Sequence, residues 1–406
     1  MGDRFSTSRT MSTSPAKLKV DLAYYNAREK RLLSAGIYKS VDVAKKVTNF
    51  QSHGEIALAD FLNYFLIHRA ENPLFATYAD RAKLLTTAIV MLEHVVTTHN
   101  TINWQPGSGD LQKWVGESVS LSVVGSMFGL TSADWNTIPV MQVSGFDFER
   151  ILTGITIGNS VIQVESKGSF VNDNTIGQPA IRTHVHNIRN KKKNIIAAGS
   201  TYSHPAAIRF GVIASIDQTR TARCLLLDPP GDELEGELYR FKIASRLEHL
   251  SFILWLLAPR AQLPRVLVDR ASKWRAVNNE EPKGSLTYPN GYAFTPANYV
   301  ESYLARNKVW LKKQDVVGQL FQIDGKHQIF IGVQGDVVRA AIKQDIPAIL
   351  QQTFEPSSTA MEIRSRSVNV GVHGRDKAGE EKSYQLTFHR ASSGVVIGVT
   401  DTPASD

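Results

Sequence analysis

Between residues 111 and 227 the sequence alternates helical and extended patterns, and this order restricts the chain to folds built around a sheet. Asp110 can cap a helix that runs from Leu111 to Phe128 and ends before Gly129. A basic helix follows over Ile181–Ala198. Apolar runs predict strands before and after it at Asp147–Ile157, Ser160–Ser169, Ile208–Ile216 and Ala222–Leu227. The order helix, strand, strand, helix, strand predicts a mixed α/β arrangement around one central sheet.

The flanking regions differ in pattern, and they divide the rest of the chain. Residues 1–15 are polar and indicate a disordered tail, whereas residues 16–105 have helical apolar spacing. Pro106, Gly107 and Gly109 mark a linker, so the α/β core is predicted over 106–235. Residues 236–406 begin with a helix and continue into strands, which predicts an α+β region. Within that region Asp324-Gly325 predicts the turn of a β-hairpin.

The composition is that of a basic protein without a membrane segment. There are 46 Lys and Arg against 38 Asp and Glu, which gives a net charge of +8 and attracts polyanions such as nucleic acid. The longest apolar run, 250–258, is too short to span a bilayer, and residues 1–15 lack the apolar centre of a secretory signal. Cys224, the one cysteine, excludes an intrachain disulfide and fits a reducing compartment. We expect a cytoplasmic protein.

The residue types that can carry chemistry gather within the predicted α/β core. Side chains two apart on a strand share a face, so Glu165 and Lys167 lie together at the end of an apolar strand. Such a pair is costly to bury unless something uses it. Asp147 begins the preceding strand, and a hairpin turning at Gly158-Asn159 would bring it beside Glu165. Mg²⁺ binds paired carboxylates and retains waters, one of which can become a nucleophile.

Glu117 on the first helix, Asp147 on the next strand and Glu165-x-Lys167 on the strand after it resemble the PD-(D/E)xK nuclease superfamily. The resemblance covers residues 110–230 and implies a restriction-endonuclease-like core. It implies that Asp147 and Glu165 bind Mg²⁺ or Mn²⁺ with help from the Ser166 carbonyl. It also implies that Lys167 activates a water and that Glu117 is an auxiliary acid.

The register of the first acidic strand leaves two residues open as the metal ligand. The residue before Asp147 is Phe146, where the superfamily motif has a proline. Glu149 shares a strand face with Asp147 and is the alternative ligand, although we favour Asp147. The motifs Gly-Glu, Asp-Phe-Glu and Val-Glu-Ser-Lys-Gly are most similar to nuclease domains of bacterial anti-phage defence and restriction proteins. This similarity implies DNA as the substrate and defence against foreign DNA as the setting.

The predicted basic helix carries a run of cations without an acid inside it. Beside the carboxylates these side chains can grip phosphates, and the alternative is a solvated helix face. The cations are Arg182, Arg189, Lys191, Lys192 and Lys193. His184 and His186 stand at alternate positions, but no Cys or acidic ligand accompanies them, which argues against zinc.

Together these features predict a Mg²⁺-dependent endonuclease that hydrolyses phosphodiester bonds. The chief alternative is a catalytically inactive nucleic-acid-binding or scaffold protein whose acids form structural ion pairs. A second alternative is a structural protein that coats nucleic acid through its positive charge. Because an ungated nuclease would damage its host, we expect the flanking regions to regulate the site, bind a partner defence protein or form a homo-oligomer.

Overall fold

The structure is a computed structural model of the chain. It describes residues 11–13, 16–68, 81–82, 84–85, 101–102, 109–138, 146–152, 160–198, 206, 208–219, 221–227, 239–276, 281–295, 299, 309–311, 314–322, 328–369 and 377–400. The chain divides into two compact units. We name them the mixed-sheet unit (17–56 and 94–242) and the barrel unit (1–16, 57–93 and 243–406).

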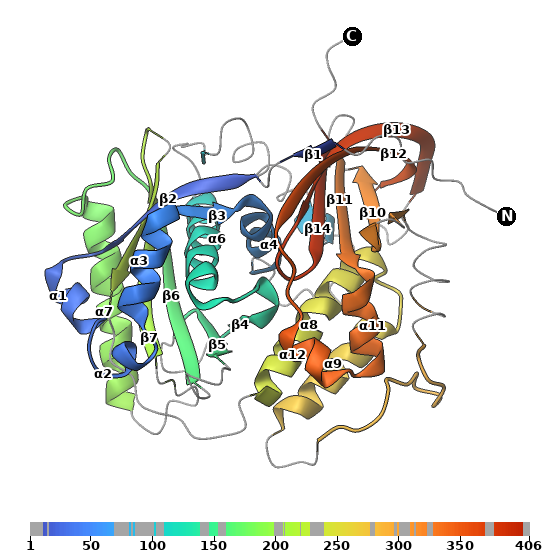
Figure 1. The fold of residues 1–406 in the computed structure, drawn as a ribbon, viewed down its shortest axis with the longest axis horizontal. Coiled ribbons are helices and arrows are strands. Elements are labelled where there is room, and N and C mark those ends of the chain that lie inside the picture. Colours follow the sequence, from blue (N-terminus) through green and yellow to red (C-terminus); the bar gives the residue numbers. More distant parts are fainter. Residues whose placement is uncertain are drawn as a thin grey trace, which may run out of the picture. The chain divides into compact units, whose positions relative to one another are not determined.

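The mixed-sheet unit is built on a seven-stranded sheet in the order β3-β2-β8-β7-β6-β5-β4 (Figure 1). Its strands are β2 (Lys17–Tyr24), β3 (Glu55–Ala57), β4 (Asn136–Thr137), β5 (Phe148–Leu152), β6 (Ser160–Phe170), β7 (Ile208–Ile216) and β8 (Ala222–Leu227). β4, β5 and β6 pair antiparallel, whereas β6 and β7 pair in parallel. β8 pairs antiparallel with β7 and parallel with β2. The mixed α/β class predicted from the sequence is confirmed.

Helices α6 (Gly109–Phe128) and α7 (Pro179–Ala198) cover opposite faces of this sheet (Figure 1). Side chains alternate along a strand, so successive residues of β6 face the two helices in turn. Ser166 Oγ lies 3.5 Å from the Gly116 carbonyl oxygen of α6, whereas Glu165 contacts Lys191 of α7. An apolar cluster seals part of the α7 face: Val171, Ile181, Val185, Ile188, Ile213, Leu225 and Leu227. Shorter helices α1 (Ala27–Leu32), α2 (Gly36–Ser40) and α3 (Val43–His53) connect β2 to β3.

Helix α6 approaches β6 closely at two glycines. A Cβ atom built on Gly116 would fall well inside contact distance of the Gly168 backbone. A Cβ atom on Gly168 would collide with the Gln112 carbonyl oxygen of α6. Since backbone cannot yield as a flexible side chain does, both positions require glycine. This contact fixes α6, and Glu117 on it, against the strand that carries Glu165 and Lys167.

The barrel unit is built on a second seven-stranded sheet in the order β1-β12-β13-β14-β11-β10-β9. Because β10 also pairs in parallel with β12, strands β10 to β14 close into a ring. The strands are β1 (Met11–Thr13), β9 (Val309–Leu311), β10 (Val316–Gln322), β11 (Gln328–Gln334), β12 (Ser357–Asn369), β13 (Lys377–Arg390) and β14 (Val395–Thr400). Side chains such as Leu320, Phe330 and Leu386 form its buried core.

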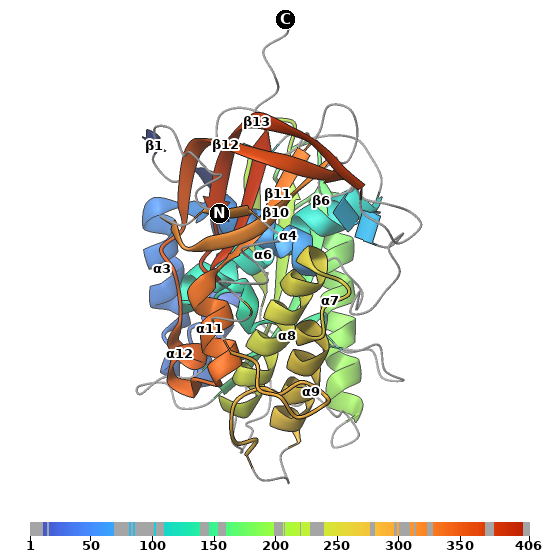
Figure 2. The same cartoon turned by 90° about the vertical axis from the view of Figure 1, so that its right-hand side faces the viewer.

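Helices of the barrel unit gather at one end of these strands (Figure 2). They are α8 (Tyr239–Leu257, in this unit from residue 243), α9 (Leu263–Arg275), α11 (Gly335–Lys343) and α12 (Ile346–Gln351); α4 (Leu58–His68) also belongs to the unit. Arg246 of α8 donates hydrogen bonds to the carbonyl oxygens of Ile349 and Gln352, which ties α8 to α12. Among the helices that the structure describes, none combines the length and the apolar character needed to cross a bilayer.

The structure contains the helices and strands predicted for the α/β core. The limits of its two units differ from those of the regions predicted from the sequence. β7 and β8 have the predicted bounds, and the hairpin of β10 and β11 is present, with its Asp324-Gly325 turn outside the described residues. Residues 16–105 do not form one helical region, because Lys17–Tyr24 is a strand of the central sheet. Leu18, Val20 and Leu22 are buried between exposed neighbours, which is the period-two pattern of a strand. Met11–Thr13, inside the predicted tail, pairs with β12.

The glycine contact predicts a position-specific loss of stability. Gly116→Ala should destabilise the chain by about 1–3 kcal/mol, because the added methyl group overpacks α6 against β6. Gly109→Ala, in the same helix with nothing within 4 Å of its Cβ position, should be neutral or slightly stabilising. Urea unfolding of the full-length variants measures both effects. Equal midpoints for the two variants would show that α6 can move away from β6 without cost.

Candidate active site

The β5–β6 hairpin brings the two predicted metal ligands together. Phe148 pairs with Val164 across the antiparallel ladder, so Asp147 comes opposite Glu165 at the next position. Residues directly opposite one another point to the same face of a sheet, with Cβ atoms about 5 Å apart. The Ser166 backbone amide donates a 3.2 Å hydrogen bond to Asp147 Oδ2, which orients that carboxylate.

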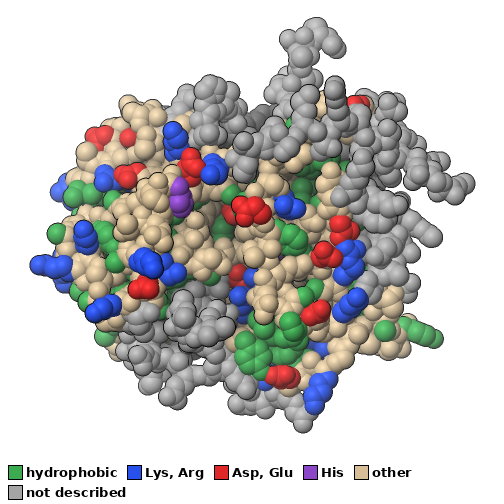
Figure 3. All heavy atoms as spheres, viewed as in Figure 1, with side chains coloured by type: hydrophobic (Ala, Val, Ile, Leu, Met, Phe, Trp, Pro, Cys, Tyr) green, Lys and Arg blue, Asp and Glu red, His purple; other side chains and the backbone are tan. Residues whose placement is uncertain are grey.

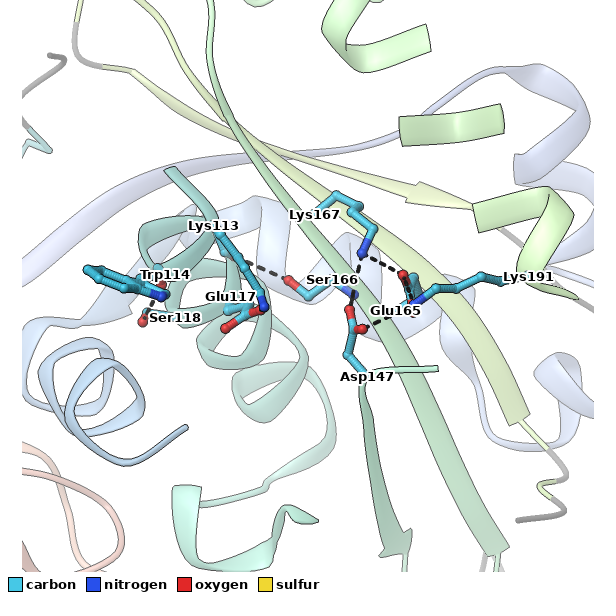
Figure 4. A network of polar contacts seen from close by, with 10 residues as sticks. Lys113, Trp114, Glu117, Ser118, Asp147, Glu165, Ser166, Lys167 and Lys191 are labelled. Atoms are coloured by element: carbon cyan, nitrogen blue, oxygen red, sulfur yellow. Dashed lines mark hydrogen bonds and ion pairs between the residues drawn. The ribbon is translucent and has the colours of Figure 1, made fainter. Parts of the chain in front are cut away.

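Four side chains form one network, which we call the charge cluster: Asp147, Glu165, Lys167 and Lys191 (Figure 4). Lys167 Nζ lies 2.5 Å from Glu165 Oε1 and 3.4 Å from Asp147 Oδ2. Lys191 Nζ lies 2.7 Å and 2.8 Å from the Glu165 oxygens Oε1 and Oε2, and 3.2 Å from Asp147 Oδ1. Each ammonium group therefore contacts both carboxylates.

Burial makes Glu165 the most constrained member of the charge cluster. Its side chain is 0% exposed, whereas those of Asp147 and Lys191 are 24% and 25% exposed. Desolvation, followed by the charge of Asp147, raises the pKa of Glu165 to about 7, and the two lysines oppose that rise. Burial lowers the pKa of Lys167, but the Asp147 and Glu165 carboxylates outweigh burial and raise its pKa overall. The carboxylates thus hold Lys167 in its charged form.

Glu117, the predicted auxiliary acid, lies on α6 on the other side of Ser166 from the charge cluster (Figure 4). Its side chain is 8% exposed, and Lys113 Nζ is its ion-pair partner at 3.8 Å. Desolvation raises the pKa of Glu117 to about 7, and the charge of Asp147 contributes to the rise. Glu117 is therefore coupled to the cluster through the electrostatic field, with Lys113 as its direct partner.

The two acids fit a divalent cation of the magnesium type. Oxygens of both Asp147 and Glu165 converge on one ammonium nitrogen, so both can reach a single cation. Mg²⁺ is held in many sites by one or two carboxylates, with waters and substrate phosphates completing the shell. Within the part of the chain that the structure describes, no group of three or more His, Cys, Asp or Glu side chains could hold a metal ion. Carboxylate oxygens are ligands that suit Mg²⁺ and Mn²⁺, and Asp147 and Glu165 are the residues that would hold such an ion.

The five cations of the predicted phosphate-binding run on α7 differ in their surroundings. Arg189 Nη2 lies 2.6 Å from the buried Glu29 Oε1, and Lys191 belongs to the charge cluster. Both cations therefore neutralise carboxylates of the unit, which the sequence analysis did not predict. Arg182 and Lys193 are exposed, and Lys192 is half-buried. Arg182 and Lys193 remain the candidates for contacts with an external phosphate.

Helix periodicity is the signal that could have located Lys191. The buried residues of α7 include Ile188 and Ile195, which mark the stripe that faces the sheet. Lys191 lies three residues after Ile188 and four before Ile195, so it belongs to the same stripe. A cation on that stripe has to meet an acid of the sheet, because a buried unpaired charge is too costly.

Glu149, the alternative metal ligand, pairs through its backbone with Gln163, and its side chain lies outside the described residues. Phe146 is 2% exposed and packs in a cluster with Ile195 of α7. An aromatic ring at this position therefore anchors the chain against α7 immediately before Asp147, where the superfamily motif has a proline.

The remaining candidates have local structural roles. His184 Nε2 lies 2.7 Å from Ser169 Oγ, and His186 Nε2 lies 2.8 Å from Asn190 Nδ2. Cys224 is fully buried, and desolvation raises the pKa of its thiol.

Comparison with protein-family models, with curated proteins and with solved structures finds no match for this chain. The interpretation of the candidate site therefore rests on the geometry of its own side chains and on the resemblance of its motifs to the PD-(D/E)xK superfamily.

The buried Glu117 carboxyl predicts a pH-dependent gain of stability on substitution. Because its pKa is about 7 in the folded chain and ordinarily 4.5, its contribution to stability is fully present below pH 4.5 and is lost as pH rises through 7. Glu117→Gln removes this loss. The variant should gain up to about 3 kcal/mol relative to wild type between pH 4.5 and pH 8. Urea unfolding of both proteins at the two pH values measures the gain, and a pH-independent difference would contradict it.

Proposed function

We propose that the chain is a metal-dependent nuclease and that the charge cluster is its active site. The observation that carries this proposal is that carboxylate oxygens of Asp147 and Glu165 both contact the Lys191 ammonium. The Lys167 ammonium also contacts both acids. The helix, strand, strand, helix, strand order around a mixed sheet supports the resemblance to the PD-(D/E)xK superfamily. By that resemblance, DNA is the substrate and defence against foreign DNA is the setting.

Each residue has a distinct role in this proposal. Asp147 and Glu165 hold the divalent ion, and the Ser166 carbonyl helps them. When bound, the ion lowers the pKa of a coordinated water and stabilises the charge that develops on the phosphate oxygens. Lys167 positions the attacking water, because its ammonium is fixed beside both carboxylates. Glu117 supplies a second buried acid at the α6 side of β6.

Contacts with nucleic acid are assigned to the exposed cations of α7, Arg182 and Lys193. The overall charge of +8 favours a polyanion. On the face shown in Figure 3, however, the described Lys and Arg side chains are interspersed with Asp and Glu. That face is therefore not uniformly basic, and the proposal assigns the interface to Arg182 and Lys193 alone.

A second candidate function follows from the charge balance of the cluster. Two lysines contact two carboxylates, which is also how a structural ion-pair network is satisfied. In that case the chain is a catalytically inactive nucleic-acid-binding or scaffold protein. The two functions differ in their response to metal, since only the nuclease requires it.

The direct test is cleavage by the full-length protein. Supercoiled plasmid and a structured RNA are each incubated with the protein in Mg²⁺, in Mn²⁺ or in EDTA. Nicking or linearisation of the plasmid that requires metal supports the nuclease, and cleavage of RNA alone would reassign the substrate. Retarded migration of intact plasmid in all three conditions would favour the inactive binding protein.

Substitutions at Glu165 and Lys167 should separate metal binding from chemistry. Glu165→Gln removes a negative ligand, so metal affinity and cleavage should fall together. Lys167→Ala leaves both carboxylates in place, so metal should still bind, while the chemical step slows by a factor of about 10²–10⁴. Calorimetric metal titration and single-turnover cleavage measure the two effects, with Lys45→Ala on the exposed face of α3 as the control. If both variants cut like wild type, the active site lies elsewhere.

Neutralising the exposed cations of α7 should weaken binding of every nucleic-acid sequence. In the double variant Arg182→Gln, Lys193→Gln, each lost phosphate contact should lower the slope of log affinity against log salt by about 0.9. Lys19→Gln, Lys45→Gln changes the same number of exposed cations on β2 and α3 and serves as the control. Fluorescence anisotropy over a salt series measures the slopes. Identical slopes for the two double variants would show that Arg182 and Lys193 do not contact nucleic acid.

A further inference from the structure

Lys191 makes more contacts with the carboxylates than the proposed mechanism uses. Its Nζ lies within 2.8 Å of both Glu165 oxygens and 3.2 Å from Asp147 Oδ1. Lys167, by comparison, contacts one oxygen of each acid. The Lys191 ammonium therefore takes the place between the acids where an ion shared by them would bind (Figure 4).

We infer that Lys191 is a resident cation that the divalent ion has to displace, so that this lysine sets the metal concentration at which the site is loaded. The inference rests on the proposed nuclease function and names how that site is regulated. In the absence of metal the ammonium keeps the two carboxylates together and compensates the buried charge of Glu165. On metal binding the side chain leaves and the acids keep their positions.

Charge counting supports displacement rather than addition. The charge cluster carries two carboxylates and two ammonium groups, so its formal charge is zero. A divalent ion added to the intact cluster would give a charge of +2 around the fully buried Glu165 side chain. Departure of Lys191 lowers that excess by one unit. Like charges held within a few ångströms in a partly buried site repel strongly, which disfavours retention of both lysines.

The position of Lys191 on α7 allows it to leave without movement of the backbone. Ile188 and Ile195 on either side are buried and hold the helix against the rest of the unit. The lysine side chain itself is 25% exposed and has a flexible four-carbon stem. A change of side-chain rotamer can therefore carry the ammonium from the carboxylates into solvent. Lys167, on β6 two residues from Glu165, stays beside the acids.

The test uses Lys191→Met, which keeps an unbranched side chain of similar length and removes its charge. Calorimetric titration of the full-length protein with Mn²⁺, without nucleic acid, should show binding at least about tenfold tighter than in wild type. Lys191→Arg retains the charge and should keep the weaker affinity of wild type. Lys45→Met, the same substitution on the exposed face of α3, should also leave it unchanged. Glu165→Gln combined with Lys191→Met should abolish binding, which locates the ion.

A measurement on the wild-type protein keeps the inference testable if Lys191→Met fails to fold. Brief labelling with acetic anhydride, read by mass spectrometry, reports how accessible each amine is. Labelling of Lys191 should increase on addition of Mn²⁺, and that of Lys45 should stay constant.

The outcomes separate the two proposals. Unchanged Mn²⁺ affinity in Lys191→Met, or unchanged Lys191 labelling, in a protein that binds Mn²⁺ and cleaves plasmid overturns the displacement inference and leaves the nuclease intact. Absence of both Mn²⁺ binding and cleavage in wild type and in Lys191→Met overturns the nuclease proposal itself.

Discussion

The site is organised around the need to compensate one fully buried carboxylate. Glu165 lies on an internal strand of the sheet, which is paired on both sides and covered by helices on both faces. An isolated charge in such a place would cost several kcal/mol, so cations must reach it. Lys167 reaches it along the same strand and Lys191 from α7. Compensation of the buried Glu165 charge therefore links the position of α7 to the hairpin of β5 and β6.

The same requirement explains how one set of residues supports both a structural and a catalytic interpretation. Lysine ammonium groups and a divalent ion are alternative means of neutralising the same acids. What distinguishes this cluster from an inert core ion pair is its partial access to solvent, since Asp147, Lys167 and Lys191 are each about a quarter exposed. An ion or a phosphate can approach from that side without disruption of the apolar layers, in which Val164 and Ile188 are fully covered.

Much of the fold could be predicted because local patterns and long-range packing agree there. The largely apolar runs of β7 and β8 are typical of strands in the interior of a sheet, and their bounds followed directly. Lys17–Tyr24 was assigned to a helical region, although its alternating burial is that of a strand. The alternation of charged and apolar residues in Lys17–Leu22 is a local signal of a strand, so the strand itself could have been predicted. Its place in the central sheet could not, because the partner strand β8 lies about two hundred residues later in the chain.

For the site, the sequence by itself determined which residue types lie on which face of β6, because strand geometry fixes the alternation of Glu165 and Lys167 with Val164 and Ser166. It also brought Asp147 to the neighbouring strand through a short connection. Only the tertiary structure decided that Lys191 lies between the two carboxylates, that Arg189 pairs with Glu29, and that Gly116 and Gly168 bring α6 against β6. The reason is that a helix can turn any of its faces toward a sheet. The choice among those faces depends on apolar packing and charge compensation between segments far apart in the chain.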